Sequence, residues 1–306
     1  MKYVKILALI SIIFFVSTPV SADTYDVTLE PGVIHNMSAY RMWIDPATTR
    51  IRGILILNPG SNSDGRAAVE DEVWQNFATK HNFALMGTYL TDHMHPNMMI
   101  ENYIQVGKGS GQAIIDAIDQ FADESGHEEL SYAPFLLWGM SAGGELNYEL
   151  AAWIPARIIA FVVNMGGYYY SSAPPEASRQ TPGLFFVGLD DLPSRTTMVR
   201  GLFLTHRRAG ALWTLAEEKG VGHEVVGSRD LALIYFEEVM KKRLPENAMG
   251  YKSLKAVNED MGTVGDIYKH KLAPLEEGTM KEATAWLVSD KFAKAWLAFV
   301  TKERKN

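Results

Sequence analysis

The chain has 306 residues, of which 47% are hydrophobic and 21% charged, a composition typical of a globular protein rather than a disordered one. Its net charge of −7 argues against binding to duplex nucleic acid, which requires a run of lysines and arginines opposite the phosphates. The absence of cysteine excludes disulfides, thiolate metal sites and cysteine nucleophiles, so any catalysis must use hydroxyl, imidazole, carboxylate or amine groups.

Residues 1–22 have the pattern of a secretory signal peptide. Lys2 and Lys5 precede an apolar run over residues 6–16, and small residues follow as far as Ala22. The apolar run is too short for a comfortable membrane span, so we expect cleavage after Ala22 rather than an uncleaved anchor. The expected location of the mature protein is therefore secreted or periplasmic, without membrane association.

The next part of the chain predicts an α/β fold. Residues 24–30 and 39–45 alternate polar and apolar side chains, which indicates antiparallel strands at the N-terminal edge of a sheet. Short apolar runs then alternate with helical patterns, which indicates a mostly parallel central sheet with helices on both faces. The predicted strands are residues 53–57, 83–86, 135–138, 158–163, 184–187 and 211–215, and the predicted helices are residues 71–80, 111–122, 142–153 and 196–208.

Residues 23–244 are predicted to form one domain, because no linker or repeat divides them. Residues 245–306 form a C-terminal extension that is polar and lysine-rich as far as Ala283. Phe292, Trp296 and Phe299 then follow at spacings of four and three, which predicts a terminal helix packed on the outside of the same domain. A role in covering substrate is the alternative for this helix.

The most informative motif is Gly139-Met140-Ser141-Ala142-Gly143, which joins a predicted strand to a predicted helix. A serine on such a tight turn has strained backbone angles, and side chains two residues to either side would collide, which explains Gly139 and Gly143. The turn is expected to raise Ser141 above the sheet as a nucleophile. An ordinary glycine-rich turn is the alternative interpretation.

A serine nucleophile requires a base, and an imidazole titrates in the appropriate range. Of the eight histidines, His223 is preferred because it lies in the glycine-rich loop after a predicted strand. A carboxylate must orient that imidazole, and Asp190 and Asp191 both follow the strand at residues 184–187. The position alone leaves both aspartates open.

An oxyanion formed at a carbonyl carbon requires N–H donors. We expect one from the backbone of Ala142, directly after the nucleophile, and the second from Ser61 in the loop after the strand at residues 53–57. Gly60 gives that loop room to turn inward.

These motifs resemble the α/β-hydrolase superfamily. Asn58-Pro59-Gly60-Ser61, the Ser141 motif and Gly222-His223 are most similar to the secreted esterases that include feruloyl esterases and poly(3-hydroxybutyrate) depolymerases. The resemblance covers residues 40–243, and Asn58-Pro59 replaces the His-Gly of many relatives. It implies the chain order Ser141, Asp191, His223 for the triad and favours Asp191 over Asp190, because the carboxylate usually stands three positions beyond the glycine at the strand exit.

Other signals are weaker. The segment from Asp92 to His95 resembles a metal-binding cluster but lacks a third ligand at a familiar spacing, and the glycines around Lys108 do not have the spacing of a phosphate-binding loop, so no metal or cofactor is expected. The side chains expected to line a substrate pocket are those of Met94, His95, Tyr168 and Tyr169.

Together these features predict an exported serine esterase that cleaves carboxylic esters through an acyl-enzyme. Its expected partners are small or polymer-linked esters, including aromatic, plant-cell-wall or polyester substrates. A peptidase on the same fold and a non-catalytic carbohydrate-binding module are the alternatives. The sequence leaves the oligomeric state open.

Overall fold

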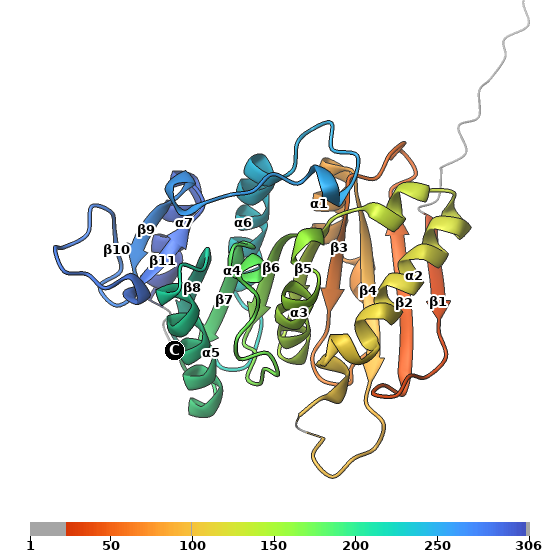
Figure 1. Ribbon diagram of the computed structural model, residues 1–306, viewed down its shortest axis with the longest axis horizontal. Helices are drawn as coiled ribbons and strands as arrows, with labels where there is room; N and C mark the ends of the chain where they lie inside the picture. The colour runs from red at the N-terminus through yellow and green to blue at the C-terminus, as the bar shows by residue number, and fades with distance from the viewer. Residues whose placement is uncertain (1–22, 99, 304–306) are drawn as a thin grey trace, which may run out of the picture.

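A mixed sheet of eight strands forms the centre of the protein, in the order β1-β2-β4-β3-β5-β6-β7-β8 (Figure 1). The computed structural model describes residues 23–98 and 100–303. The predicted signal peptide, residues 1–22, lies outside the described residues. Within the described ranges, no helix has both the length and the apolar character needed to cross a membrane.

The direction of the strands follows the predicted pattern. β1 pairs antiparallel with β2 and β2 pairs antiparallel with β4, whereas every pairing from β4 to β8 is parallel. The strands are β1 (Asp23–Thr28), β2 (Met37–Ile44), β3 (Gly53–Asn58), β4 (Phe83–Thr91), β5 (Phe135–Gly139), β6 (Ile158–Asn164), β7 (Gly183–Gly188) and β8 (Trp213–Glu218). The prediction of a mostly parallel sheet with antiparallel strands at the N-terminal edge is therefore confirmed.

Helices cover both faces of this sheet, as nearly continuous apolar strands require. They are α1 (Glu72–His81), α2 (Ser110–Ser125), α3 (Ala142–Trp153), α4 (Glu176–Arg179), α5 (Pro193–Arg208), α6 (Ser228–Arg243) and α7 (Asp290–Val300). In β7, Phe185 contacts Phe203 of α5, whereas its neighbour Phe186 contacts Phe299 of α7. Because successive strand residues face opposite sides, α5 and α7 cover opposite faces. α3 lies on the α5 face, since the ring of its Tyr148 contacts Trp213.

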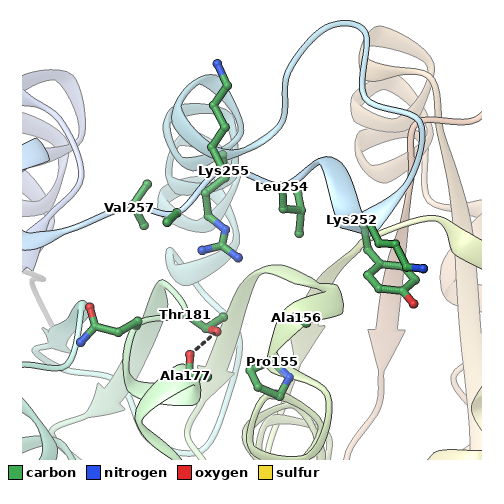
Figure 2. Close-up of a pocket in the computed structure, with 12 residues that line it drawn as sticks. Pro155, Ala156, Ala177, Thr181, Lys252, Leu254, Lys255 and Val257 are labelled. Carbon is green, nitrogen blue, oxygen red and sulfur yellow. Dashed lines mark hydrogen bonds between the residues drawn. The ribbon is translucent and has the colours of Figure 1, made fainter.

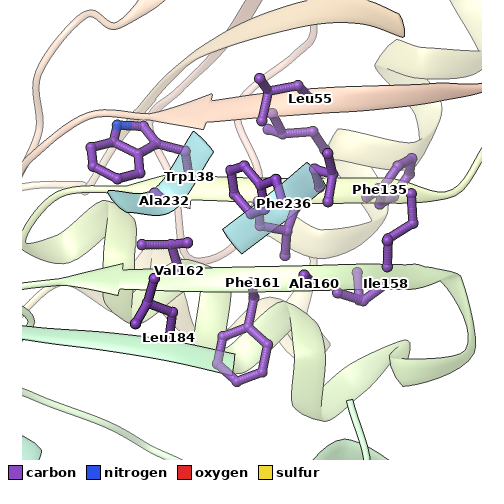
Figure 3. Packing of buried hydrophobic residues seen from close by; sticks show 14 of the residues in the cluster. Leu55, Phe135, Trp138, Ile158, Ala160, Phe161, Val162, Leu184, Ala232 and Phe236 are labelled. Atoms are coloured by element: carbon purple, nitrogen blue, oxygen red, sulfur yellow. The ribbon is translucent and has the colours of Figure 1, made fainter. Parts of the chain in front are cut away.

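The face covered by α6 shows how the apolar strands are buried. Ile158, Ala160 and Val162 alternate along β6, and Ala232 and Phe236 of α6 lie over the same part of the sheet (Figure 3). All five residues are fully buried. The hydrophobic effect at such positions is the main stabilising force of the domain, which contains no disulfide.

The structure adds elements that the pattern did not indicate. α6 was not predicted, because the charged side chains of Glu238 and Arg243 are buried in it and interrupt its apolar stripe. The polar part of the extension contains three short strands, β9 (Thr263–Asp266), β10 (Lys271–Leu272) and β11 (Thr284–Leu287), which form a separate antiparallel sheet.

The extension packs beside β8, the edge strand of the main sheet (Figure 1). The indole of Trp296 in α7 donates to the carbonyl of Leu215 in β8 at 2.7 Å. Phe292 of α7 contacts Tyr235 of α6, with ring centroids 4.9 Å apart. The aromatic stripe of the terminal helix therefore lies against the main domain.

This packing predicts that Trp296→Ala destabilises the protein strongly. The side chain is fully buried, so its removal leaves a cavity and an unpaired carbonyl at Leu215, and we expect a loss of about 3–5 kcal/mol in the free energy of unfolding. Urea denaturation would measure the change. Lys294→Ala, at an exposed position of the same helix, is the control, and an equal effect of both substitutions would contradict the assigned packing.

Candidate active site

Ser141 stands between β5 and α3 in an unusual backbone conformation. Its φ is 55° and its ψ is −125°, outside the regions that L-residues normally occupy. The N–H of Ser141 donates to the carbonyl of Asn164, at the end of β6, at 2.8 Å. Such strain costs of order 1–3 kcal/mol and is typically found at functional sites.

The two glycines of the motif are required by close backbone contacts. A Cβ atom at Gly139 would lie 2.2 Å from the carbonyl oxygen of Gly143. A Cβ atom at Gly143 would lie 2.3 Å from the carbonyl oxygen of Asn58 and 2.4 Å from that of Pro59. Gly143 therefore allows the end of β3 to lie directly against the turn that carries Ser141.

A buried amide network, which sequence reasoning missed, holds these segments together. The Asn58 side chain donates to Asn147 of α3 at 2.7 Å and accepts from the Thr88 hydroxyl of β4 at 2.7 Å. Asn147 in turn donates to the carbonyl of Val162 in β6 at 2.8 Å. The signal in the sequence is an asparagine at the end of an apolar strand and another within an apolar helix, because a buried amide requires partners.

Asp191 and His223 come together from the loops that follow β7 and β8. The His223 Nδ1 lies 2.7 Å from Asp191 Oδ2. A Cβ atom at Gly188 would lie 2.3 Å from the carbonyl oxygen of Gly222, so the loop that carries the histidine crosses directly over the end of β7. Asp190 is exposed, and its backbone N–H donates to the carbonyl of Val221.

The environment of Asp191 favours its ionised form. Burial raises the pKa of this carboxyl, but the hydrogen bonds from His223 and from the Leu192 N–H outweigh burial and hold the pKa below its usual value. The Leu192 N–H lies 2.7 Å and the Arg195 guanidinium 3.3 Å from Asp191 Oδ1. An ionised Asp191 accepts a hydrogen bond from the N–H at His223 Nδ1, which leaves Nε2 as the basic nitrogen.

Ser141 and His223 lie at the same end of the sheet, because β5, β7 and β8 are parallel and both residues follow the carboxyl ends of their strands. Among the described residues, no hydrogen bond joins the Ser141 hydroxyl to the imidazole, and His223 Nε2 has no partner. The structure therefore connects two of the three predicted triad residues directly.

The predicted oxyanion donors border the same turn. A Cβ atom at Gly60 would lie 3.8 Å from the Cβ of Ser141, so the loop after β3 passes beside the nucleophile. The N–H of Asn62 donates to the Tyr103 hydroxyl at 3.3 Å, which fixes this loop. Within the described chain, the N–H groups of Ser61 and Ala142 donate to no other residue.

The two predicted pocket residues after β4 have different surroundings. Met94 is 89% exposed, whereas the His95 imidazole lies 3.0 Å from the buried carboxylate of Asp92. The other oxygen of Asp92 accepts from the N–H groups of Asn102 and Tyr103. Asp92 therefore organises its own loop, and the described residues contain no group of three or more side chains suited to hold a metal ion.

The two predicted pocket tyrosines follow β6. The Tyr168 N–H donates to the buried carboxyl of Glu145 in α3 at 2.9 Å, and the Tyr169 ring packs edge-on against Tyr148. Burial raises the pKa of Glu145 to about 7. Among the residues that the structure describes, no hydrogen bond or ring contact connects Tyr168 or Tyr169 to Ser141 or His223. The tyrosine loop is instead attached to α3.

Solved structures share this architecture. No family model and no curated protein matches the sequence. The chain is similar to an S-formylglutathione hydrolase from Agrobacterium tumefaciens, with a TM-score of 0.54 and 11% identity over 74% of this chain and 99% of that one. It is also similar to a ferulic acid esterase, with a TM-score of 0.53 and 12% identity over 72% of this chain and 98% of that one.

A third similar structure is LpqC, a poly(3-hydroxybutyrate) depolymerase from Bordetella parapertussis, with a TM-score of 0.53 and 15% identity over 74% of this chain and 92% of that one. At these identities the likeness shows the fold. The chain has the α/β-hydrolase fold, and the resemblance noted from its motifs is confirmed at that level.

The steric fit at the turn predicts that Gly143→Ala is destabilising. The new methyl group would meet two backbone carbonyls, which cannot rotate away, so we expect a loss of about 1–3 kcal/mol in the free energy of unfolding. Gly201→Ala is the control, since its Cβ would meet nothing within 4 Å and the helix α5 should gain about 0.5–1 kcal/mol. Equal effects in chemical denaturation would contradict the contact.

The lowered pKa of Asp191 predicts a specific acid dependence of stability. In the unfolded chain an aspartate titrates at about 3.9, and the folded protein holds this carboxyl at a lower pKa. The ionised side chain therefore stabilises the protein fully above the unfolded value, and this contribution disappears as the pH falls through the folded pKa. The difference in unfolding free energy between wild type and Asp191→Asn should shrink over that range, whereas parallel pH profiles would contradict the prediction.

Proposed function

We propose that the protein is a serine hydrolase that cleaves carboxylic esters through an acyl-enzyme. The observation that carries this proposal is the strained, positive-φ Ser141 on a turn between strand and helix. It lies at the carboxyl ends of the parallel strands, where His223 and Asp191 are hydrogen-bonded to each other. A strained serine beside an oriented imidazole is the arrangement that activates a hydroxyl for acyl transfer.

In the proposed mechanism, His223 Nε2 removes the proton of Ser141 as its Oγ attacks the ester carbonyl. The N–H groups of Ser61 and Ala142 stabilise the oxyanion, and His223 then donates the proton to the departing alcohol. Water, activated by the same imidazole, releases the acid. Asp191 keeps the proton on Nδ1 throughout. The missing hydrogen bond between Ser141 and His223 would form with substrate, since catalytic hydrogen bonds are often long in free enzymes.

The surroundings of the pair favour an ester with apolar groups. Leu192 is 55% exposed beside Asp191, and Val225 and Val226 are 43% and 44% exposed just after His223. Exposed aliphatic side chains next to a reactive group provide apolar contact surface for a substrate. Among the similar folds are proteins named as a ferulic acid esterase and a poly(3-hydroxybutyrate) depolymerase, so aromatic and polyester substrates are the classes to test first.

We also propose that the protein acts outside the cytoplasm after removal of residues 1–22. The order of positive, apolar and small residues in that segment supports export. A chain without cysteine then depends on its apolar core rather than on disulfides for stability in that compartment.

The proposed mechanism predicts that Ser141→Ala abolishes ester hydrolysis. We expect wild type to hydrolyse short p-nitrophenyl esters or methyl hydroxycinnamates, and the variant to lose about three or more powers of ten in rate, because one member of a catalytic triad is removed. Initial rates at neutral pH would measure the change. Ser131→Ala, a serine outside the site, is the control and should retain wild-type activity.

A fluorophosphonate probe separates this proposal from the alternatives. Labelling at Ser141 would support an activated serine, and the Ser141→Ala variant should remain unlabelled. Cleavage of aminoacyl anilides without cleavage of esters would indicate a peptidase. Sugar binding without labelling would indicate a carbohydrate-binding module and would overturn the mechanism.

A further inference from the structure

A second candidate binding site lies at the amino-terminal ends of the parallel strands, whereas Ser141 lies at their carboxyl ends. A cavity of about 470 Å³ is formed where the extension crosses the segments that precede β6 and β7. In Figure 2, Leu254 and Val257 of the extension stand on one side of this cavity, and Ala156 and Thr181 stand on the other. Its volume is within the range of about 300–1,000 Å³ that is typical of small-molecule sites.

Arg243, the last residue of α6, lines this cavity and is only 7% exposed. Its Nη2 donates to the carbonyl of Ile158 at 3.0 Å, whereas its buried Nε has no hydrogen-bond partner. Burial lowers the pKa of Arg243 to about 10, so the side chain is charged at neutral pH. No carboxylate lines the cavity, and within the described ranges Arg243 takes part in no ion pair.

Two other buried arginines show how unusual this arrangement is. Arg207 donates to the carbonyls of Thr284 and Ala211 and pairs with the carboxylate of Glu259. Arg157 donates through Nε and Nη2 to two carbonyls, and its guanidinium lies 4.3 Å from the ring centroid of Phe135. A buried charge normally has such partners, because burial without them is costly. Arg243, by contrast, donates to a single carbonyl and lines an open cavity.

The other groups around the cavity are consistent with a ligand of negative charge. Lys252 and Lys255 lie on the wall formed by the extension, and the ammonium group of Lys255 extends away from the cavity in Figure 2. The lysines therefore add positive potential at the rim, while Arg243 is the group positioned for contact. The Thr181 hydroxyl already donates to the carbonyl of Ala177 at 3.0 Å.

We propose that this cavity binds a small organic carboxylate, with the carboxylate on Arg243 and the apolar part of the ligand against Leu254 and Val257. A single guanidinium with one nitrogen already engaged suits one negative charge, and the aliphatic wall suits a hydrocarbon body rather than a phosphate. β6 has 7 residues between its amino-terminal end, near the cavity, and its carboxyl end, near Ser141. The site therefore lies roughly 20 Å from Ser141 and is independent of the proposed hydrolysis.

Calorimetric titration of the full-length protein with hexanoate and with benzoate at neutral pH tests the proposal. We expect saturable binding in the millimolar range or tighter for at least one of them. Arg243→Met should weaken binding roughly tenfold to a hundredfold, because it removes a charge-assisted hydrogen bond. Arg208→Gln, at an exposed arginine, should bind as wild type does.

A second variant keeps the test decisive if Arg243→Met does not fold. Ala156→Trp would fill the cavity from its opposite wall and should abolish binding while leaving Arg243 in place. In crystals soaked with 4-bromobenzoate, the anomalous signal of bromine should lie in this cavity. The proposal is overturned if wild type binds neither carboxylate, if folded Arg243→Met or Ala156→Trp binds as well as wild type, or if the bromine lies only beside Ser141.

Discussion

The contact between the end of β3 and the first turn of α3 is the constraint on which the candidate active site depends. Because Gly143 has no side chain, the carbonyls of Asn58 and Pro59 can approach the helix backbone. This approach brings the following loop, with Ser61, beside Ser141. The buried amides of Asn58 and Asn147 then fix the distance, since neither can be satisfied without the other.

The second half of the site depends on a comparable contact at the end of β7. The loop after β8 crosses Gly188 so closely that a side chain there would collide with it. That crossing brings His223 to the loop after β7, where Asp191 accepts a hydrogen bond from its Nδ1. Two glycine contacts, one beside the serine and one beside the acid–base pair, thus position the loops after β3 and β8 at the carboxyl ends of the parallel strands.

Much of the fold was predictable because buried parallel strands have a simple signature. Continuous, β-branched apolar runs such as residues 53–57 are typical of strands covered on both faces, and the glycines around Ser141 predicted the turn. The preference for His223 came from its loop, and the preference for Asp191 came from the resemblance to known hydrolases. The structure connects these two side chains directly.

The remainder depended on contacts between distant segments. Asn58 and Asn147 are separated by 89 positions, so neither reveals the other in the sequence. The strands of the extension have only two to four residues each, too few for a period to be recognised, and Gly265 fits under the Trp296 ring of a later helix. The environment of Arg243 likewise depends on a segment of the extension that only the fold brings near.

The position of the extension also affects how the protein meets other molecules. β8 is the last strand of the main sheet, and an uncovered outermost strand offers its free peptide groups to strands of neighbouring molecules. Here Trp296 caps the Leu215 carbonyl and the Thr214 hydroxyl donates to the Trp286 carbonyl, so the small sheet and α7 shield that side. The extension thereby opposes self-association into fibrous aggregates through this strand.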